Sequence, residues 1–514
     1  MFSMRKMNPF LSLFLASCFF FISHSQTTSN TSSQHHCLPN QSHTLLQLRQ
    51  EFVQKRLLYS DYWRYDYYNG SYPKMKSWKA DSDCCSWDGV TCDPENGHVV
   101  GLNLTNSWLN GRLNSNSTLF SLRHLHKLNL ALNNFSSSTI PSQFGHLARL
   151  THLNLSHSFL SGQIPSEISW LSNLVSLDLS YNYFKYFVGG PDDFKDLNLR
   201  RIDLEALVQN MTYLRELHLD EMNISSSLPQ SLANLSSLTS LSLSWGSLLG
   251  EFPSNTFVLP KIQAIDLTYN EDLAGFLPKF RSGYHQKYFK TWNAMLMVHG
   301  KINSKPEYMA DHSGYYEDSI TVMNKGLEME LVKILTIFIA IDLSNNRFCG
   351  EIPNTMGNLK ELIVLNLSSN SFTGPIPSSF GNLIELQSLD LSQNKFLGEI
   401  PQQLISLTFL AYLNLSQNQL IGPIPQGGQF WTFQSSSFEG NLELCGSPLL
   451  MKCENNETPT STLSYESSFG EGFNWKAVVI GYACGLVIGL LIGHVVISRR
   501  AHWFMKTFRV KLHR

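Results

Sequence analysis

The residues of this chain best suited to chemistry are its cysteines, which lie in two groups. The groups are Cys37, Cys84, Cys85 and Cys92, and then Cys445 and Cys453. Cys349 is left over as a candidate free thiol, while Cys18 and Cys484 lie in apolar segments at the two ends of the chain. Cysteines paired at both ends of a long stretch are typical of disulfides in an oxidising compartment. Metal binding is the alternative, but no Cys-x-x-Cys pair or neighbouring histidine set completes a zinc site.

Catalytic motifs are absent from the sequence. It has no Gly-x-Ser-x-Gly, His-Glu-x-x-His, phosphate-binding loop or kinase motif set. Scattered histidines, serines and aspartates are present, but no spacing organises them. We therefore expect no enzyme activity, no cofactor and no metal. The net charge of −2 gives no indication of nucleic-acid binding.

Asn-x-Ser/Thr sequons are numerous. Several arise simply because Leu-Asn-Leu-Ser recurs along the chain. Still, a secreted chain this rich in sequons is expected to carry N-linked glycans. The thirteen candidate sites are Asn30, Asn40, Asn69, Asn103, Asn116, Asn134, Asn154, Asn210, Asn223, Asn234, Asn366, Asn414 and Asn456.

A 24-residue repeat positions most of these residues. Leu359–Asn382 reads LKELIVLNLSSNSFTGPIPSSFGN, and Leu383–Ser406 reads LIELQSLDLSQNKFLGEIPQQLIS. Eleven copies start near His98, Leu122, Leu147, Leu171, Met211, Leu235, Leu259, Ile334, Leu359, Leu383 and Leu407. The alternating leucines of L-x-x-L-x-L predict a short strand that one copy alone cannot bury. Stacked copies can bury it, which predicts a solenoid with a parallel sheet on its concave side.

Two further positions of the repeat have a structural logic. The Gly-x-Ile-Pro element, as in Gly374–Pro377, predicts a turn and a fixed φ on the return path. An asparagine follows the strand in most copies, and we expect its amide to bond backbone groups of stacked turns as a ladder. These asparagines are Asn133, Asn182, Asn270, Asn346, Asn370, Asn394 and Asn418.

These motifs carry a resemblance to a known family. The Leu-x-Gly-x-Ile-Pro repeat resembles the plant-type extracellular leucine-rich repeat (LRR), and Cys84–Cys92 resembles its N-terminal cap. The run from Gly427 to Gly446 is similar to the C-terminal cap of plant LRR receptor-like proteins, the kinase-lacking, disease-resistance type. The resemblance covers nearly the whole chain. It implies an α/β-type solenoid, a plant-type LRR superhelix with a concave parallel β-sheet, plus one transmembrane helix.

The resemblance also implies specific pairs and contacts. It implies the cap disulfides Cys37–Cys84 and Cys85–Cys92, and we expect Cys445–Cys453 to close a short loop over the last repeat. Residues 281–335 interrupt the repeat and resemble the family's non-LRR island. The alternative is a disordered linker, which the richness in tyrosine disfavours. The island is expected to contact a co-receptor through Lys325, Gly326, Leu327 and Glu328.

The array departs from the family pattern at this island. Gly275–Pro278 runs almost directly into it, whereas relatives usually carry many more repeats ahead of the island. The chain therefore looks internally shortened, which bears on its ligand surface. A smaller insertion, Tyr183–Asn210, resembles a segment common in the same family.

Both ends of the chain predict secretion and membrane insertion. Residues 1–25 read as a signal peptide, with a retained signal anchor as the alternative. Residues 477–497 form an uncharged apolar stretch long enough to span a bilayer. Basic residues follow it and acidic ones precede it, which predicts a cytosolic C-terminus. Gly481, Gly485, Gly489 and Gly493 would lie on one helix face suited to close helix packing, although membrane helices tolerate glycine in any case.

The expected organisation assigns each part of the chain a role. It comprises a signal peptide (1–25), an N-terminal cap (26–97), LRR block 1 (98–280), the island (281–335), LRR block 2 (336–428), a C-terminal cap (429–453), an acidic juxtamembrane segment (454–476), a transmembrane helix (477–497) and a basic cytoplasmic tail (498–514).

We predict a single-pass type I plasma-membrane receptor with an extracellular N-terminus, acting in plant defence. Its ligand would be a pathogen-derived or other extracellular peptide or protein, and signalling would use an LRR receptor kinase held by the transmembrane helix and an LRR co-receptor kinase. The candidate ligand residues on the concave strands are His157, Tyr181, Trp245 and Tyr269. The alternative is that these four are variable surface residues with no role in binding. The alternative functions are a developmental peptide receptor, a shortened non-signalling decoy, and a wall-enzyme inhibitor like those of polygalacturonase.

Overall fold

The computed structural model describes residues 36–55, 71–182, 197–277, 320–324, 327–331 and 339–453. Among these residues, no helix combines the length and apolar character needed to cross a membrane. Several expected features lie outside the described residues. They are the signal peptide, half of the 183–210 insertion (183–196), most of the island including Lys325 and Gly326, the juxtamembrane segment, the 477–497 helix with its four glycines, the tail, Asn30, Asn69 and Asn456.

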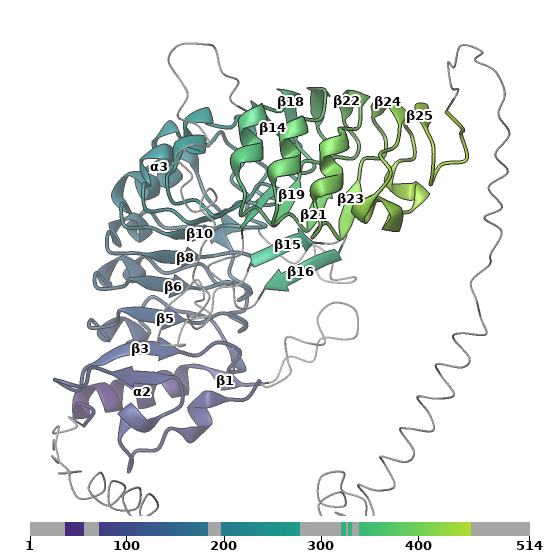
Figure 1. The fold of residues 1–514 in the computed structure, drawn as a ribbon. Helices are drawn as coiled ribbons and strands as arrows, with labels where there is room; N and C mark the ends of the chain where they lie inside the picture. Colours follow the sequence, from purple (N-terminus) through teal and green to yellow (C-terminus); the bar gives the residue numbers. More distant parts are fainter. Residues whose placement is uncertain are drawn as a thin grey trace, which may run out of the picture. The chain divides into compact units, whose positions relative to one another are not determined.

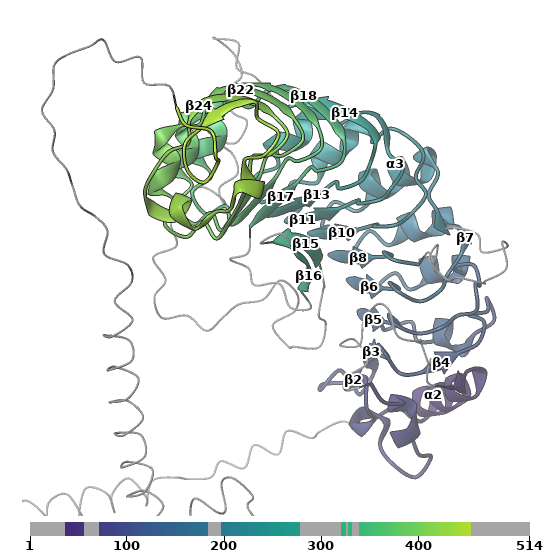
Figure 2. The same cartoon turned by 90° about the vertical axis from the view of Figure 1, so that its right-hand side faces the viewer.

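A twelve-stranded sheet lines the inner side of a curved solenoid (Figures 1 and 2). Its first strand, β2 (Val90–Cys92), belongs to the cap and runs antiparallel to β3, and the other eleven strands are parallel. Each of those comes from one copy of the repeat. They are β3 (Val99–Asn103), β5 (Lys127–Asn129), β6 (His152–Asn154), β8 (Ser176–Asp178), β10 (Glu216–His218), β11 (Ser240–Ser242), β13 (Ala264–Asp266), β17 (Ala340–Asp342), β19 (Val364–Asn366), β21 (Ser388–Asp390) and β23 (Tyr412–Asn414).

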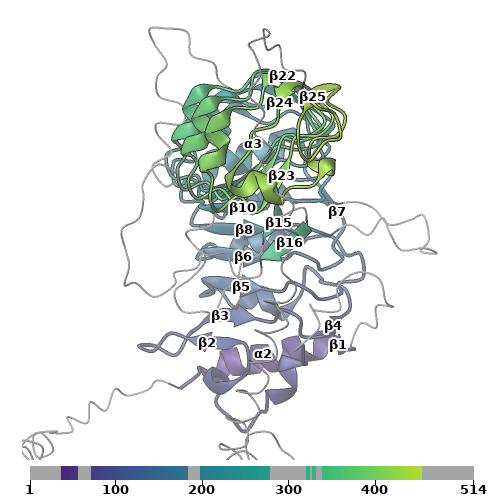
Figure 3. The ribbon, with the colours of Figure 1, turned by 45° about the vertical axis from the view of Figure 1, so that its right-hand side comes forward.

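The strand register stacks equivalent leucines. Leu153 of β6 pairs with Leu177 of β8, which pairs with Leu217 of β10, and all three are fully buried. Figure 3 shows these strands one above another, with the cap at one end of the stack. The predicted LRR solenoid with a concave parallel sheet is confirmed.

A second sheet of seven strands lies on the other side of the solenoid, where the sequence predicted only a turn. It contains β12 (Leu249–Glu251), β14 (Asp272–Phe276), β18 (Arg347–Glu351), β20 (Ser371–Gly374), β22 (Lys395–Glu399), β24 (Gln419–Pro423) and β25 (Glu443–Cys445). The glycine of Gly-x-Ile-Pro adopts positive φ at or near the end of its strand, as at Gly374 (+78°) and Gly422 (+78°), a conformation that glycine reaches without the steric cost of a Cβ.

Short 3-10 helices form the return path of the repeats. Most start directly after a proline, whose fixed φ suits the residue before a helix, as at Pro165 and Pro377. They are η3 (Thr118–Ser121), η4 (Ser142–His146), η5 (Ser166–Trp170), η6 (Gln230–Asn234), η7 (Ser254–Val258), η8 (Asn354–Asn358), η9 (Ser378–Asn382) and η10 (Gln402–Ser406). In the copy that carries the insertion, the α-helix α3 (Arg201–Asn210) takes their place and packs between η5 and η6.

Caps close both apolar ends of the array. At the N-terminal end, α2 (Pro39–Glu51) buries Leu45 and Leu48, next to η1 (Lys74–Ser77) and η2 (Cys84–Ser86). At the other end, Phe430 of η11 (Gly428–Thr432) is buried, and so is Phe438, which directly follows η12 (Ser435–Ser437). The remaining strands are short pairs. They are β1 (Val53–Gln54) with β4 (Leu109–Asn110), and β7 (Gly162–Gln163) with β9 (Leu197–Asn198).

The predicted asparagine ladder is confirmed. The Asn182 amide donates to the carbonyls of Leu155 (3.0 Å) and Leu179 (2.8 Å), and its oxygen accepts from the backbone N–H groups of Ser158 (3.0 Å) and Leu160 (3.1 Å). Each ladder asparagine therefore ties its own turn to the preceding copy. Where the asparagine is missing, the Ser158 hydroxyl donates to the carbonyl of the preceding copy.

The island does not interrupt the concave sheet. β13 pairs directly with β17, with Asp266 opposite Asp342, so that the two LRR blocks stack as one array. The described part of the island is an antiparallel hairpin of β15 (Ile320–Asn324) and β16 (Leu327–Leu331). β15 lies near β17 and β19, on the inner side of the solenoid (Figure 2).

Candidate ligand-binding surface

One position in each repeat adopts the left-handed conformation although it is never glycine. It lies three residues after each concave strand, and its N–H still donates to the next copy, as from Trp245 to Thr268 (2.9 Å). We call this position the αL slot. Its occupants from one end of the array to the other are Asn106, Leu132, His157, Tyr181, Glu221, Trp245, Tyr269, Asn345, Ser369, Gln393 and Gln417, with φ between 50° and 57°.

The four candidate ligand residues occupy this slot and form two stacked pairs. His157 and Tyr181 stack with ring centroids 4.7 Å apart, and Trp245 and Tyr269 with centroids 4.0 Å apart. Trp245 is 48% exposed and Tyr269 37%. Glu221 occupies the slot between the two pairs. We call His157, Tyr181, Trp245 and Tyr269 the aromatic ledge.

The placement of these residues on the concave strands was wrong in detail. Each lies in the turn that follows its strand, three residues after the last strand residue. The ledge therefore lies along one border of the concave sheet. Whether it binds a ligand stays a prediction.

The concave sheet beside the ledge carries buried polar side chains. Asp266 accepts from the backbone N–H and the hydroxyl of Thr268 (2.9 and 2.5 Å), and Asp342 accepts from the amide of Asn366 (2.9 Å). Burial, together with the neighbouring Asp342 and Asp220, raises the pKa of Asp266 well above its usual value. Burial likewise raises the pKa of Asp342. These carboxyls are held inside the array by their hydrogen bonds and are not presented to solvent.

At the opposite border lies an open groove of about 660 Å³, next to the amino ends of β5, β6, β8 and β10. No aspartate or glutamate is among the described residues that line it. These are His126, Lys127, Arg149, Thr151, Asn173, Val175, Tyr213, Arg215 and Ser237. We call it the basic groove. Sequence reasoning missed it, because Lys127, Arg149 and Arg215 stand at different positions of their copies and come together only in the folded array.

The histidines around this groove are packed with its cations. The Arg149 guanidinium lies 3.0 Å from Nδ1 of His124, and His124 stacks on His98 with ring centroids 3.6 Å apart. Burial, the main cause, lowers the pKa of His152 to about 4; Lys127 and Arg215 lower it further, and Glu216 opposes them. Burial also lowers the pKa of Lys127.

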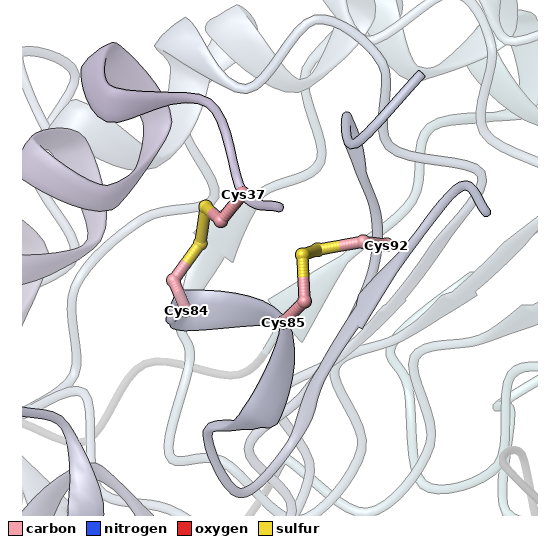
Figure 4. Close-up of side chains that lie close together, drawn as sticks. All are labelled: Cys37, Cys84, Cys85 and Cys92. Carbon is pink, nitrogen blue, oxygen red and sulfur yellow. A yellow bond between two sulfur atoms is a disulfide. The ribbon is translucent and has the colours of Figure 1, made fainter. Parts of the chain in front are cut away.

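The cap cysteines lie together in two disulfides, Cys37–Cys84 and Cys85–Cys92 (Figure 4). Their four sulfur atoms lie within 4.8 Å of one another, a spacing that a metal site would also require. Cys37 lies two residues before α2, Cys84 and Cys85 belong to η2, and Cys92 belongs to β2. The bonds therefore join the segment that leads into α2 to η2, and η2 to the concave sheet. Cys445–Cys453 closes the other end, and Cys349 of β18 is a half-buried free thiol. All three predicted pairs are thus present: the resemblance implied the first two, and Cys445–Cys453 was expected to close a short loop over the last repeat.

The sequons differ in accessibility. Asn154 and Asn366 are 4% and 5% exposed, and their amides donate to Asp178 and Asp342 (both 2.9 Å). A glycan on either nitrogen would replace that hydrogen bond. The side chains of four other candidates, Asn40, Asn116, Asn210 and Asn234, are exposed.

Of the four expected co-receptor residues, only Leu327 and Glu328 fall within the described residues. Both belong to β16, opposite Asn324 and Met323 of β15. Their contact with a co-receptor stays a prediction.

Comparison with known proteins gives a consistent family. The description "Leucine rich repeat N-terminal domain" fits residues 66–93, and leucine-rich-repeat descriptions fit residues 149–171 and 340–396. Receptor-like protein 43 of Arabidopsis thaliana is 48% identical over 334 residues, which are 61% of this chain and 47% of that protein. Receptor-like protein Cf-9 of Solanum pimpinellifolium is 39% identical over 257 residues, which are 49% of this chain and 28% of that protein.

The chain is a leucine-rich-repeat protein related to the plant receptor-like proteins. It spans about half the length, or less, of these relatives. Among solved structures, the LRR ectodomain of the Arabidopsis receptor kinase HAESA, in complex with an N-terminally extended IDA peptide hormone, matches with a TM-score of 0.51. It is 25% identical, and the match covers 75% of this chain and 50% of that one. The predicted resemblance to plant LRR receptor-like proteins is thereby confirmed.

Proposed function

We propose that this protein is a cell-surface receptor that recognises an extracellular peptide or pathogen-derived ligand in plant defence. Recognition would use the concave side of the array, with the aromatic ledge as its anchor. The observation that carries this proposal is the conformation of the ledge: large aromatic side chains stand at positive φ, where asparagine or glycine would fit more easily.

The energetic cost of that conformation can be compared with the alternatives in the same chain. A residue with a Cβ loses roughly 1–2 kcal/mol in the left-handed region, and asparagine is among the side chains that tolerate it best. The C-terminal copies carry Asn345, Ser369 and Gln393 in the same slot. Aromatics there are therefore not a requirement of the fold. Exposed, stacked aromatics supply rigid contact area, which is what anchor residues provide at binding sites.

The ligand class is supported by the comparison with HAESA, whose ectodomain was solved with a peptide hormone. The island hairpin adds a second element on the same side of the array, since β15 lies near β17 and β19. We propose that β16, with Leu327 and Glu328, contacts a co-receptor kinase next to the bound ligand.

We further propose that the protein is not an enzyme and signals through a partner. The sequence has no catalytic motif, so the output would come from a receptor kinase held through the 477–497 helix. In this proposal the protein is a glycosylated, single-pass type I protein of the plasma membrane. The names of its relatives support a receptor.

A response assay in plant cells tests the proposal. The full-length chain would be expressed in leaf cells and challenged with a library of short synthetic secreted peptides, with cytosolic calcium as the readout. A peptide that evokes a response should fail on the double variant Trp245→Ala/Tyr269→Ala. Trp170→Ala is the matched control, because Trp170 is at least as exposed as Trp245 (56% against 48%) but lies on the return path in η5. Equal responses from wild type and the double variant at equal surface levels would contradict the proposal that the aromatic ledge anchors the ligand.

A second function is favoured by the direct pairing of β13 with β17. Because the shortened array is continuous, it can fold and bind without signalling, as a decoy would. The same assay separates the two: a decoy binds the peptide, gives no calcium response and suppresses the response of a co-expressed full-length relative.

A further inference from the structure

We propose that the basic groove binds an extended acidic peptide segment. This inference deepens the proposed function, since it assumes a peptide ligand or partner. It assigns that peptide a chemistry, namely carboxylates on one face of an extended chain. The groove lies across the sheet from the aromatic ledge and would form a separate subsite.

The groove is cationic because of where its residues lie in the repeat. Arg149 and Arg215 are exposed and come from two copies whose strands, β6 and β10, are separated only by β8. Lys127 adds a third positive charge from β5. Glu216 is the acid that follows Arg215 in sequence, but it is buried (7% exposed) and acts on His152 of the concave sheet.

The charge of this border changes sign along the array. The slot of Arg149, two residues after the first leucine of its copy, carries Glu361 and Glu385 in the C-terminal block. A uniformly solvated face would not need this segregation. Opposite charges at the two ends of the border would attract an acidic segment to the first copies and repel the same segment from the last ones.

The arginines are suited to carboxylates. A guanidinium offers a planar fork of donors that matches the two oxygens of a carboxylate. One nitrogen of Arg149 is engaged by His124, which in turn stacks on His98, so the side chain is held in place before any ligand arrives. This preparation reduces the entropy that binding would cost.

The spacing of the charges fits an extended peptide that crosses the strands. Adjacent strands lie about 4.8 Å apart, so Lys127 and Arg215, three strands apart in the order β5-β6-β8-β10, are separated by roughly 14 Å. Residues i and i+4 of an extended peptide are separated by about 13 Å and point to the same side. Carboxylates at alternate positions would thus meet both ends of the groove and Arg149 between them. Thr151, Asn173 and Ser237 also line the groove. The Thr151 hydroxyl donates to the carbonyl of His126 and the Asn173 amide to that of Ala148, so their oxygens face the peptide as acceptors for its backbone N–H groups.

Fluorescence anisotropy on the purified full-length protein in detergent tests this inference. The probe is a labelled (Glu-Ser)4 peptide, with (Gln-Ser)4 as the uncharged counterpart. We expect the acidic peptide to bind, its affinity to fall with added salt, and the glutamine peptide not to bind. Equal binding of the two peptides would refute a carboxylate site.

Matched variants locate the site. Arg149→Gln/Arg215→Gln should weaken binding roughly a hundredfold, since each of the two lost charge-assisted bonds is worth about one tenfold step. Arg149→Lys/Arg215→Lys should keep part of the affinity, and Lys395→Gln on the second sheet should leave it unchanged. Unchanged melting temperatures would show that the variants are folded. Unchanged affinity of the double glutamine variant would overturn the assignment.

Two further measurements distinguish a peptide from a polysaccharide as the ligand, and failure of the groove inference from failure of the proposed function. Tetragalacturonate, an acidic sugar of equal charge, should compete more weakly than the peptide; stronger binding would replace the peptide with a polysaccharide. Trp245→Ala/Tyr269→Ala should leave binding of the (Glu-Ser)4 probe unchanged. The calcium response could require the ledge, while substitution of Arg149 and Arg215 changes neither that response nor binding of the (Glu-Ser)4 probe. In that case the groove inference is wrong and the proposed function stands.

Discussion

At the scale of single residues, the ladder asparagines hold the array together while the ledge residues next to them do not. Asn270 donates to the carbonyls of Leu243 and Leu267 and accepts from the N–H of Leu248, all inside the protein. Neighbouring positions of one turn thus have separate roles: one side chain satisfies buried backbone groups, and the other faces outward.

Replacing Asn270 by alanine should lower the free energy of unfolding by about 3 kcal/mol, because several buried backbone groups would lose their partners. Asn173→Ala is the control, since that exposed amide makes one bond, to Ala148, and its loss should cost about 0.5 kcal/mol or less. Urea unfolding of the full protein measures both. Equal costs for the two variants would mean that the ladder does not stabilise the array.

The buried pair Asp266 and Asp342 predicts a pH dependence of stability. Because the pKa of Asp266 is raised on folding, mainly by burial, the folded state holds its proton more tightly than the unfolded state. The stabilisation is fully present below the ordinary value of 3.8 and is lost as the pH rises through the raised pKa. Asp266→Asn cannot ionise, so its melting temperature should exceed that of wild type near neutral pH. The gap should shrink as the pH falls toward about 4; a gap independent of pH would contradict this origin.

Glycan occupancy should follow burial. We expect sugar at Asn40, Asn116, Asn210 and Asn234, and none at Asn154 or Asn366 of the folded protein, because a glycan there would replace a buried hydrogen bond. Glycopeptide mass spectrometry of the protein from plant membranes measures each site. Full occupancy at Asn154 in folded protein would show that the concave sheet is more open than described.

At the scale of elements, the sequence predicts the strands that a hydrophobic period marks, but it does not predict the strands and turns that form only when copies stack. The leucine pattern of L-x-x-L-x-L predicted each concave strand, because burial of alternate side chains leaves a visible period. The strands around Gly374 and Gly422 carry no such pattern of their own and form only when copies align. The positive φ of Trp245 is equally invisible, since its stability depends on the hydrogen bond to Thr268 of the next copy.

The candidate surfaces were predicted to different extents. Equivalent positions in the repeat identified the aromatic residues, but not that they stack in pairs in the left-handed turn. The basic groove needed the register between β6, β8 and β10, which the insertion between Tyr183 and Asn210 obscures in the sequence. The two disulfides of the N-terminal cap were predicted from the resemblance, and Cys445–Cys453 from the short loop that it closes.

The island should be dispensable for folding but not for association. β13 pairs with β17 without it, so deletion of residues 308–330 should leave the melting temperature within a few degrees of wild type, while ligand-induced co-receptor association is lost. Thermal unfolding and co-immunoprecipitation, at matched surface expression, measure the two effects. Retained association would remove the island from the receptor contact.

At the scale of the whole molecule, signalling would depend on the segment that carries the four glycines. Gly485→Leu/Gly489→Leu should keep the chain in the membrane while holding a partner helix at a distance, because close backbone packing drives such pairing in lipid. Co-purification of the receptor kinase should fall sharply at normal surface levels. Val487→Leu, which changes a residue between the glycines, is the control. If the kinase is recovered in full from the glycine variant, recruitment would be assigned to the extracellular array.

The junction between β13 and β17 also bears on how such chains change over generations. Asp266 faces Asp342 across that junction in the same register that joins other neighbouring copies, as between Asp342 and Asn366. Whole copies can therefore be lost or gained by unequal crossing-over, and the new neighbours meet through compatible surfaces. The proposed recognition surface would then be inherited in units of one repeat, so a gene of this kind could exchange ligand contacts without first having to evolve a new fold.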